Sequence, residues 1–136
     1  MKMATKFNDM FAMVSCDDVQ DSIAFYTENL GFSVSDRMDT VGKSGWASIR
    51  NGSVQLMLAS PDYIPQPQKS EGRYSQAMYY FYPEDVQSLH ADLQQRGLSV
   101  SELTARFYGM TEFEMLDPSG HVLVFGQETD EIKTRN

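Results

Sequence analysis

The chain has 136 residues, of which 41% are hydrophobic and 22% are charged, so it can form one globular domain and is too apolar for intrinsic disorder. Nineteen acidic against eleven basic residues give a net charge of -8, which argues against a nucleic-acid partner, because phosphate binding needs the opposite sign. A single cysteine excludes an internal disulfide, and no apolar run approaches the ~18 residues of a membrane span, so we expect a cytoplasmic protein without a membrane partner.

The first half of the chain predicts a strand, a helix and three more strands. Residues 11–16 form an apolar run, and Asp17 or Asp18 can cap the helix that follows. Gly31 is a natural residue to end that helix. The other strands are expected near residues 32–39, 46–50 and 54–59, the last two joined by an Asn51-Gly52 hairpin turn.

The second half predicts the same order of elements. A strand at 77–82 precedes a helix at 84–96, which ends at Gly97. Strands are expected near residues 102–107, 110–116 and 122–125, with a turn at 117–120. The proline-rich stretch 61–75 predicts a linker, and the polar residues 128–136 predict a loose tail.

Three short matches relate the two halves in the same order. Asp18-Val19-Gln20 recurs as Asp85-Val86-Gln87, Gly31-Phe32-Ser33-Val34-Ser35 as Gly97-Leu98-Ser99-Val100-Ser101, and Asn51-Gly52-Ser53-Val54 as Ser119-Gly120-His121-Val122. Such nearly constant spacing indicates a duplicated module. We therefore predict a single domain, 1–136, with module one at about 9–60, the linker at about 61–75, module two at about 76–127 and the tail at 128–136.

Two stretches carry a resemblance to a known family. The first consists of Val14-Ser15-Cys16-Asp17-Asp18, Ser22-Ile23-Ala24-Phe25-Tyr26 and Leu30-Gly31-Phe32. The second consists of Tyr108-Gly109-Met110-Thr111-Glu112-Phe113, Asp117-Pro118-Ser119-Gly120 and Phe125-Gly126. The chain resembles the vicinal oxygen chelate superfamily, which includes glyoxalase I, extradiol dioxygenases, fosfomycin resistance enzymes and bleomycin resistance proteins. The second stretch is most similar to the bleomycin resistance branch. The resemblance implies an α+β fold of two tandem βαβββ modules that form a curled mixed sheet.

The metal-using members of this superfamily take four ligands from matching strands. The resemblance places those positions at Phe11, Leu56, Met78 and Val124, or, with a shift of one residue, at Ala12, Gln55, Ala77 and Leu123. Only Gln55 among them is even a weak ligand for a divalent ion. Neither histidine changes this expectation: His90 is expected on a helix surface, and His121 on the sheet face opposite Val124. We therefore predict no metal site and no cofactor, and we expect Cys16 to be a small buried residue.

Without a metal, the concave face of the sheet is the candidate ligand groove. Period-two alternation from the four positions, together with Tyr108, predicts the ligand-binding residues Phe11, Met13, Trp46, Ser48, Leu56, Leu58, Met78, Tyr80, Tyr82, Tyr108, Met110, Glu112, Glu114 and Val124. A filled core would explain the aromatic residues individually, but Glu112 and Glu114 stand ~7 Å apart on one strand face. Two unpaired carboxylates there would raise each other's pKa, unless water, a cationic ligand or a cation such as Arg37, Arg50 or Arg106 meets them.

These observations favour a metal-free protein that sequesters a cationic or aromatic small molecule, as bleomycin resistance proteins do. The alternative is a glyoxalase-like lyase or a dioxygenase that uses non-standard residues, with Glu112 as a weak candidate for a general base. A vestigial structural module is a third reading. We also expect a homodimer, because a curled sheet with an exposed aromatic face suits a two-fold partner.

Overall fold

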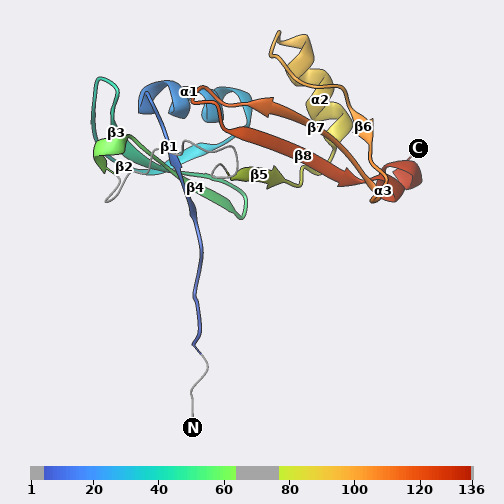
Figure 1. Ribbon diagram of the computed structural model, residues 1–136, viewed down its shortest axis with the longest axis horizontal. Coiled ribbons are helices and arrows are strands. Elements are labelled where there is room, and N and C mark those ends of the chain that lie inside the picture. Colours follow the sequence, from blue (N-terminus) through green and yellow to red (C-terminus); the bar gives the residue numbers. More distant parts are fainter. Residues whose placement is uncertain (1–4, 64–76, 136) are drawn as a thin grey trace. The chain divides into compact units, whose positions relative to one another are not determined.

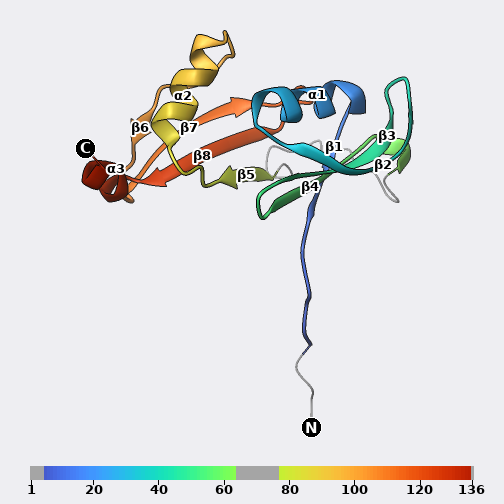
Figure 2. The same cartoon turned by 180° about the vertical axis from the view of Figure 1, so that it is seen from behind.

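The computed structural model describes residues 5–63 and 77–135, and the chain divides between Pro67 and Gln68 into two compact units. Each unit has a four-stranded mixed sheet with a helix against it (Figure 1 and Figure 2). The predicted α+β class of two strand–helix–three-strand modules is confirmed. Of the predicted linker, 61–63 form a short 3-10 helix, and 64–75 lie outside the described residues.

The first unit comprises β1 (Ala12–Ser15), α1 (Val19–Asn29), β2 (Ser33–Val41), β3 (Ser44–Asn51) and β4 (Val54–Ala59), with the strands in the order β1-β4-β3-β2. The β1–β4 pair is parallel, and the other pairs are antiparallel. Asp18 caps α1 by accepting the N–H of Asp21 at 3.2 Å, and Gly31 follows the helix with a φ of +70°, where glycine avoids a steric penalty. Beneath α1 lies a core that includes the fully buried Tyr26 and Ile49.

The second unit repeats this plan with β5 (Met78–Phe81), α2 (Val86–Gln95), β6 (Thr104–Ala105), β7 (Met110–Leu116) and β8 (Val122–Glu128), in the order β5-β8-β7-β6. Asp85 caps α2 through the N–H of Ser88 at 3.0 Å. Under the helix, the Phe125 ring stacks on Phe113 and Phe81, at centroid distances of 5.0 and 5.3 Å. The contact of Phe113 with His90 of α2 places this apolar stack on the helix side of the sheet.

Two elements differ from the sequence-based expectations. Residues 128–136 were expected to be a loose tail, but β8 runs on to Glu128 and α3 (Thr129–Arg135) follows it. The Thr129 N–H, at the start of α3, donates to the Gly109 carbonyl at 2.9 Å. The acidic residues in the first turn of α3 interact favourably with the positive end of the helix dipole. The strand expected at 102–107 contains only Thr104–Ala105. Before it, Ser101 forms hydrogen bonds with the backbone of Glu114 at the edge of β7. After it, the chain turns at Gly109, whose φ is +91°.

The histidines and the cysteine have structural surroundings. The His121 ring packs edge-on to Tyr79, with the centroids 5.9 Å apart, on the helix side of the sheet as predicted. His90 is more than a surface residue: its ring contacts Phe113, and its Nε2 lies 2.9 Å from the Ser101 carbonyl oxygen. Cys16 is fully buried, as expected. Among the described residues, no helix is both long and apolar enough to cross a lipid bilayer.

Candidate functional site

The helix-free face of the second sheet carries the side chains that the sequence analysis singled out. Paired residues of neighbouring strands point to the same face, and the register pairs Tyr80 and Glu114 with Val124, and Glu112 with Gly126. The predicted alternation in this sheet is therefore confirmed for Met78, Tyr80, Met110, Glu112, Glu114 and Val124. Tyr82 follows β5 and is 76% exposed, and its ring lies 5.0 Å from that of Tyr80.

In the first sheet, the predicted sheet face was wrong for Leu56 and Leu58. Leu56 pairs with Ile49 and Leu58 with Ala47, and all four are buried on the α1 side of the sheet. Ser48 pairs instead with Met57, which in turn pairs with Met13. Trp46, Ser48, Met13 and Met57 therefore share the helix-free face of this unit, and Phe11 lies before β1 and is 36% exposed. A shift of one residue along a strand turns every side chain to the opposite face, and counting from Leu56 places the β4 side chains on the wrong face by this shift.

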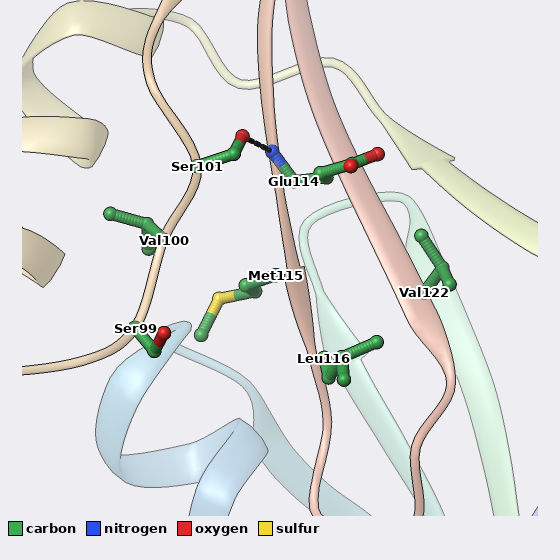
Figure 3. Close-up of a pocket in the computed structure, with 7 residues that line it drawn as sticks. All are labelled: Ser99, Val100, Ser101, Glu114, Met115, Leu116 and Val122. Atoms are coloured by element: carbon green, nitrogen blue, oxygen red, sulfur yellow. Dashed lines mark hydrogen bonds between the residues drawn. The ribbon is translucent and has the colours of Figure 1, made fainter.

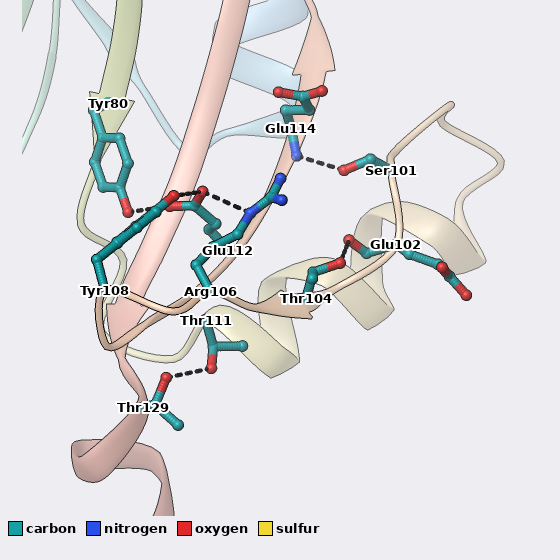
Figure 4. Close-up of polar contacts among 10 residues, drawn as sticks. All are labelled: Tyr80, Ser101, Glu102, Thr104, Arg106, Tyr108, Thr111, Glu112, Glu114 and Thr129. Carbon is teal, nitrogen blue, oxygen red and sulfur yellow. Dashed lines mark hydrogen bonds and ion pairs between the residues drawn. The ribbon is translucent and has the colours of Figure 1, made fainter.

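Glu112 is the centre of a polar cluster in the second unit. Its side chain is only 8% exposed and accepts a hydrogen bond from the Tyr80 hydroxyl at 2.6 Å and another from the Tyr108 hydroxyl. The Arg106 Nε donates to it at 3.2 Å and forms an ion pair with it. Figure 4 shows the two phenols and the guanidinium converging on this one carboxylate. We call these four residues the Glu112 cluster.

The backbone explains how the cluster forms. Arg106 and Tyr108 belong to the turn between β6 and β7, where the Arg106 N–H donates to the Met110 carbonyl at 2.7 Å. That turn returns both side chains toward Glu112, near the start of β7. Tyr80 comes from β5 and must cross β8 to reach the same carboxylate. It can do so because β8 has glycine at the crossing point: a Cβ at Gly126 would lie 2.7 Å from the Tyr80 Cζ.

Arg106, one of the cations expected as a partner of the two glutamates, pairs with Glu112, so the rise in pKa expected for an unpaired carboxylate does not apply to this residue. Burial acts to raise the pKa of Glu112, but the hydrogen bonds from Tyr108, Tyr80 and Arg106, with the Arg106 charge, outweigh it and lower the pKa. Burial and the Glu112 carboxylate raise the pKa of Tyr80, and the hydrogen bond to Glu112 is the main cause that raises the pKa of Tyr108. The cluster therefore holds an ionised carboxylate against two neutral phenols.

Glu114 has different surroundings, although it lies on the same face two residues away. It is exposed, and its backbone N–H donates to the Ser101 hydroxyl at 2.8 Å. No ion pair reaches its carboxylate within the described ranges 5–63 and 77–135. In Figure 4 this carboxylate lies apart from the Glu112 cluster. The two glutamates therefore differ in their surroundings: Glu112 is buried and paired with Arg106, and Glu114 is exposed.

A hollow next to Glu114 was missed by the sequence analysis. Its volume is about 410 Å³, and its lining residues are Ser99, Val100, Ser101, Glu114, Met115, Leu116 and Val122 (Figure 3). Only Glu114 was among the predicted ligand-binding residues. The loop 99–101 approaches β7 through tertiary hydrogen bonds, so strand alternation could not have pointed to it.

The positions that correspond to the metal ligands of the superfamily carry side chains that do not fit a divalent cation. Leu56 is turned toward α1, while Met78 and Val124 carry a thioether and a hydrocarbon. Gln55, the weak alternative, is engaged with Arg50 and Ser48, at 2.9 Å each. Within the described part of the chain, no three His, Cys, Asp or Glu side chains come together in a way that could hold a metal ion.

Comparison with known proteins places the chain among relatives of several activities. Residues 10–125 match the model of the Glyoxalase/Bleomycin resistance protein/Dioxygenase superfamily. No curated protein sequence matches the chain significantly. Solved structures share the fold. A glyoxalase family protein from Enterococcus faecalis has a TM-score of 0.71 at 21% identity, over 89% of this chain and 98% of that one.

Two further solved structures carry different names. A lactoylglutathione lyase from Agrobacterium tumefaciens has a TM-score of 0.67 at 17% identity, over 90% of this chain and 95% of that one. A bleomycin-binding protein in complex with bleomycin has a TM-score of 0.65, also at 17% identity, over 90% of this chain and 99% of that one. At such identities the likeness supports the fold and does not choose between a lyase and a binding protein.

Proposed function

Because the chain belongs to the Glyoxalase/Bleomycin resistance protein/Dioxygenase superfamily, we propose that it is a metal-free binding protein that sequesters a cationic or aromatic small molecule. The bleomycin-binding relative provides the model for this role: it holds its ligand in the solved complex. In the present chain, the proposed ligand lies against the helix-free face of the second sheet.

The Glu112 cluster is the observation that carries this proposal. A general base needs a pKa near the working pH and free access to a substrate proton. Glu112 has a lowered pKa, and its oxygens already accept hydrogen bonds from Tyr80, Tyr108 and Arg106. Such a carboxylate is better suited to orienting the two phenols than to removing a proton from a substrate. It therefore favours binding over the alternative of a lyase or dioxygenase with Glu112 as base.

The composition of the face supports the same proposal. The rings of Tyr80 and Tyr82 lie side by side, and Met78 is 60% exposed. Aromatic rings provide flat contact surfaces, and thioethers adapt to irregular ligands. The negative net charge of the chain attracts organic cations. Trp46, Ser48 and Met13 offer a similar surface on the first sheet, and their contribution to the groove stays a prediction.

The experiment is a thermal-shift screen of the purified chain against planar aromatic compounds and organic amines, followed by titration of the best ligand. Mass spectrometry then examines the ligand after long incubation, and the metal content of the protein is measured in parallel. We expect saturable binding, an unchanged ligand and no stoichiometric metal. Conversion of the ligand, or one tightly bound metal ion per chain whose removal abolishes binding, would favour the enzyme alternative instead.

A pair of variants tests where the ligand lies. Tyr82→Ala removes an exposed ring from the proposed face, and we expect about a fivefold or greater loss of affinity for an aromatic ligand. Phe7→Ala removes a ring that is 87% exposed and lies outside the sheets, so it is the matched control. Equal affinity of both variants would argue against the helix-free face of the second sheet.

A further inference from the structure

The hollow at the edge of β7 is separate from the Glu112 cluster. Four of its seven lining residues, Val100, Met115, Leu116 and Val122, have apolar side chains, and Ser99 and Ser101 add hydroxyl groups. Its volume of about 410 Å³ lies within the range of small-molecule sites. The hollow therefore has the size and the apolar walls for a small organic group.

The hollow exists because β7 is incompletely covered along this edge. β6 pairs with β7 only at Thr111 and Glu112. At Glu114 the loop residue Ser101 takes over: its N–H donates to the Glu114 carbonyl at 2.9 Å, and its hydroxyl accepts the Glu114 N–H. Beyond this contact, toward Leu116, no described strand pairs with the edge. The hollow is lined there by the loop, by β7 and by Val122 at the start of β8.

Glu114 is the one ionisable residue among those that line the hollow. In Figure 3 its side chain extends over β8, on the side of the sheet where Val122 also lies. Glu112 cannot provide a free charge for a ligand, because Arg106 is paired with it. The charge that a ligand meets at this end of the face is therefore the carboxylate of Glu114.

We propose that this hollow binds the ammonium or guanidinium arm of a small organic cation, with Glu114 as the residue that selects for positive charge. This inference rests on the proposed binding function and deepens it: it names the ligand class and assigns the choice of charge to Glu114. The apolar walls take the hydrocarbon beside the charged group, and the carboxylate pairs with its N–H donors. A neutral ligand of the same shape gains only the apolar contacts.

The experiment uses the full chain, labelled with ¹⁵N, and two small probes. The probes are 2-phenylethylamine, which is cationic at pH 7, and 2-phenylethanol, its neutral counterpart. Each probe is titrated while the backbone amide signals are recorded by nuclear magnetic resonance. We expect the amine to shift the signals of Ser99, Ser101 and Leu116, and to bind about fivefold or more tightly than the alcohol.

Two variants with the same net charge distinguish a direct contact between the amine and Glu114 from attraction of the amine by the net charge of the chain. Glu114→Gln should remove the preference for the amine, so that both probes bind with similar affinity. Glu102→Gln makes the same change in net charge at an exposed position next to Ser101, and it should keep the preference. Both substitutions are at exposed positions, so we expect folded variants, and the dispersion of the same spectra reports on this directly.

The outcomes distinguish this inference from the proposed function. Shifts confined to Tyr80, Tyr82 and their neighbours would overturn the inference and leave the proposed function standing. An equal preference for the amine in Glu114→Gln and in the native chain would also overturn it. Loss of the preference in Glu102→Gln, to the same extent as in Glu114→Gln, would show general attraction in place of a specific contact and would equally overturn it.

Discussion

Glu112 and Glu114 show how two identical side chains on one strand face acquire different roles. Glu112 is enclosed by three donors, one from β5 and two from the β6–β7 turn, whereas Glu114 is exposed. A buried carboxylate is tolerated only when hydrogen bonds and a counter-charge replace the lost water. Tyr80, Tyr108 and Arg106 fulfil that condition for Glu112. Arg106 was one of the cations expected to meet these carboxylates, and with it in place the pKa of Glu112 is lowered.

The substitution Glu112→Gln tests the charge of the cluster. The pKa of Glu112 is lowered in the folded chain, so its stabilising effect is present above the ordinary value of 4.5 and is lost as the pH falls through the lowered pKa. We expect Glu112→Gln to lower the free energy of unfolding by about 1–3 kcal/mol at pH 7. The deficit should shrink toward pH 3, and urea denaturation at the two pH values measures it.

A matched substitution controls for the loss of a carboxylate. Glu114→Gln changes an exposed residue on the same strand and should alter stability by about 0.5 kcal/mol or less. A deficit of Glu112→Gln that is the same at pH 7 and pH 3 would contradict an ionised carboxylate at the centre of the cluster.

The substitution Gly126→Ala tests the path of Tyr80. An added Cβ would lie 2.7 Å from Cζ and 2.9 Å from Cε1 of Tyr80, so the ring must leave its place over β8 and lose its bond to Glu112. In the native chain, burial and Glu112 raise the pKa of Tyr80. We expect spectrophotometric titration of Gly126→Ala to show one tyrosine ionising at lower pH than in the native chain.

The variant Tyr80→Phe provides the reference for that titration. Adding Gly126→Ala to Tyr80→Phe should cause no further change in tyrosine ionisation, because the affected hydroxyl is already absent. An unchanged titration of the single variant Gly126→Ala would mean that the sheet, and not the tyrosine ring, adjusts to the added methyl group.

At the scale of elements, both modules start their helix in the same way, and their environments then diverge. Asp18 and Asp85 each cap a helix through the N–H three residues later. In the second unit the helix start has an additional anchor in β8: the buried Gln127 accepts the Val86 N–H at 2.9 Å and donates to Glu131 in α3 at 3.0 Å. Gln127 thus connects α2, β8 and α3.

The substitution Gln127→Met tests this connection. Methionine has a similar length but cannot accept the Val86 N–H, which would stay buried without a partner. We expect a loss of about 1–3 kcal/mol in the free energy of unfolding, measured by urea denaturation. Gln94→Met, at an exposed position of α2, should change stability by about 0.5 kcal/mol or less. Equal effects of the two substitutions would show that the anchor contributes little.

At the scale of the whole molecule, we propose that the chain forms a homodimer. Met78, Tyr82 and Phe107 are 60%, 76% and 100% exposed, and a group of such side chains on one unit suits burial by a partner. A two-fold dimer is the commonest arrangement of identical chains. Light scattering after gel filtration should therefore find about twice the chain mass of 15.4 kDa. A particle of 15.4 kDa at micromolar concentration would contradict this proposal.

Much of the fold could be predicted from the sequence because its signals are local. The Asp caps, the glycines after the helices and the apolar runs each act within a few residues, and their repetition indicated two modules before any contact was known. The face of the second sheet was predicted correctly for the same reason, since the alternation there began from the right residue. The resemblance to the superfamily rested on such local stretches and is confirmed by the match over residues 10–125.

The tertiary structure alone decided the features that depend on distant partners. The register of β4 turns Leu56 and Leu58 toward α1, because pairing with β3 determines which face each residue takes. Tyr80 reaches Glu112 across 32 positions of sequence, over a strand that has a glycine at the crossing. Likewise, α3 is held at its start by the Gly109 carbonyl of the β6–β7 turn. Local sequence patterns do not encode which distant strand, turn or loop will lie beside a residue. The lowered pKa of Glu112, the exposure of Glu114 and the hollow beside Glu114 therefore depend on the folded structure.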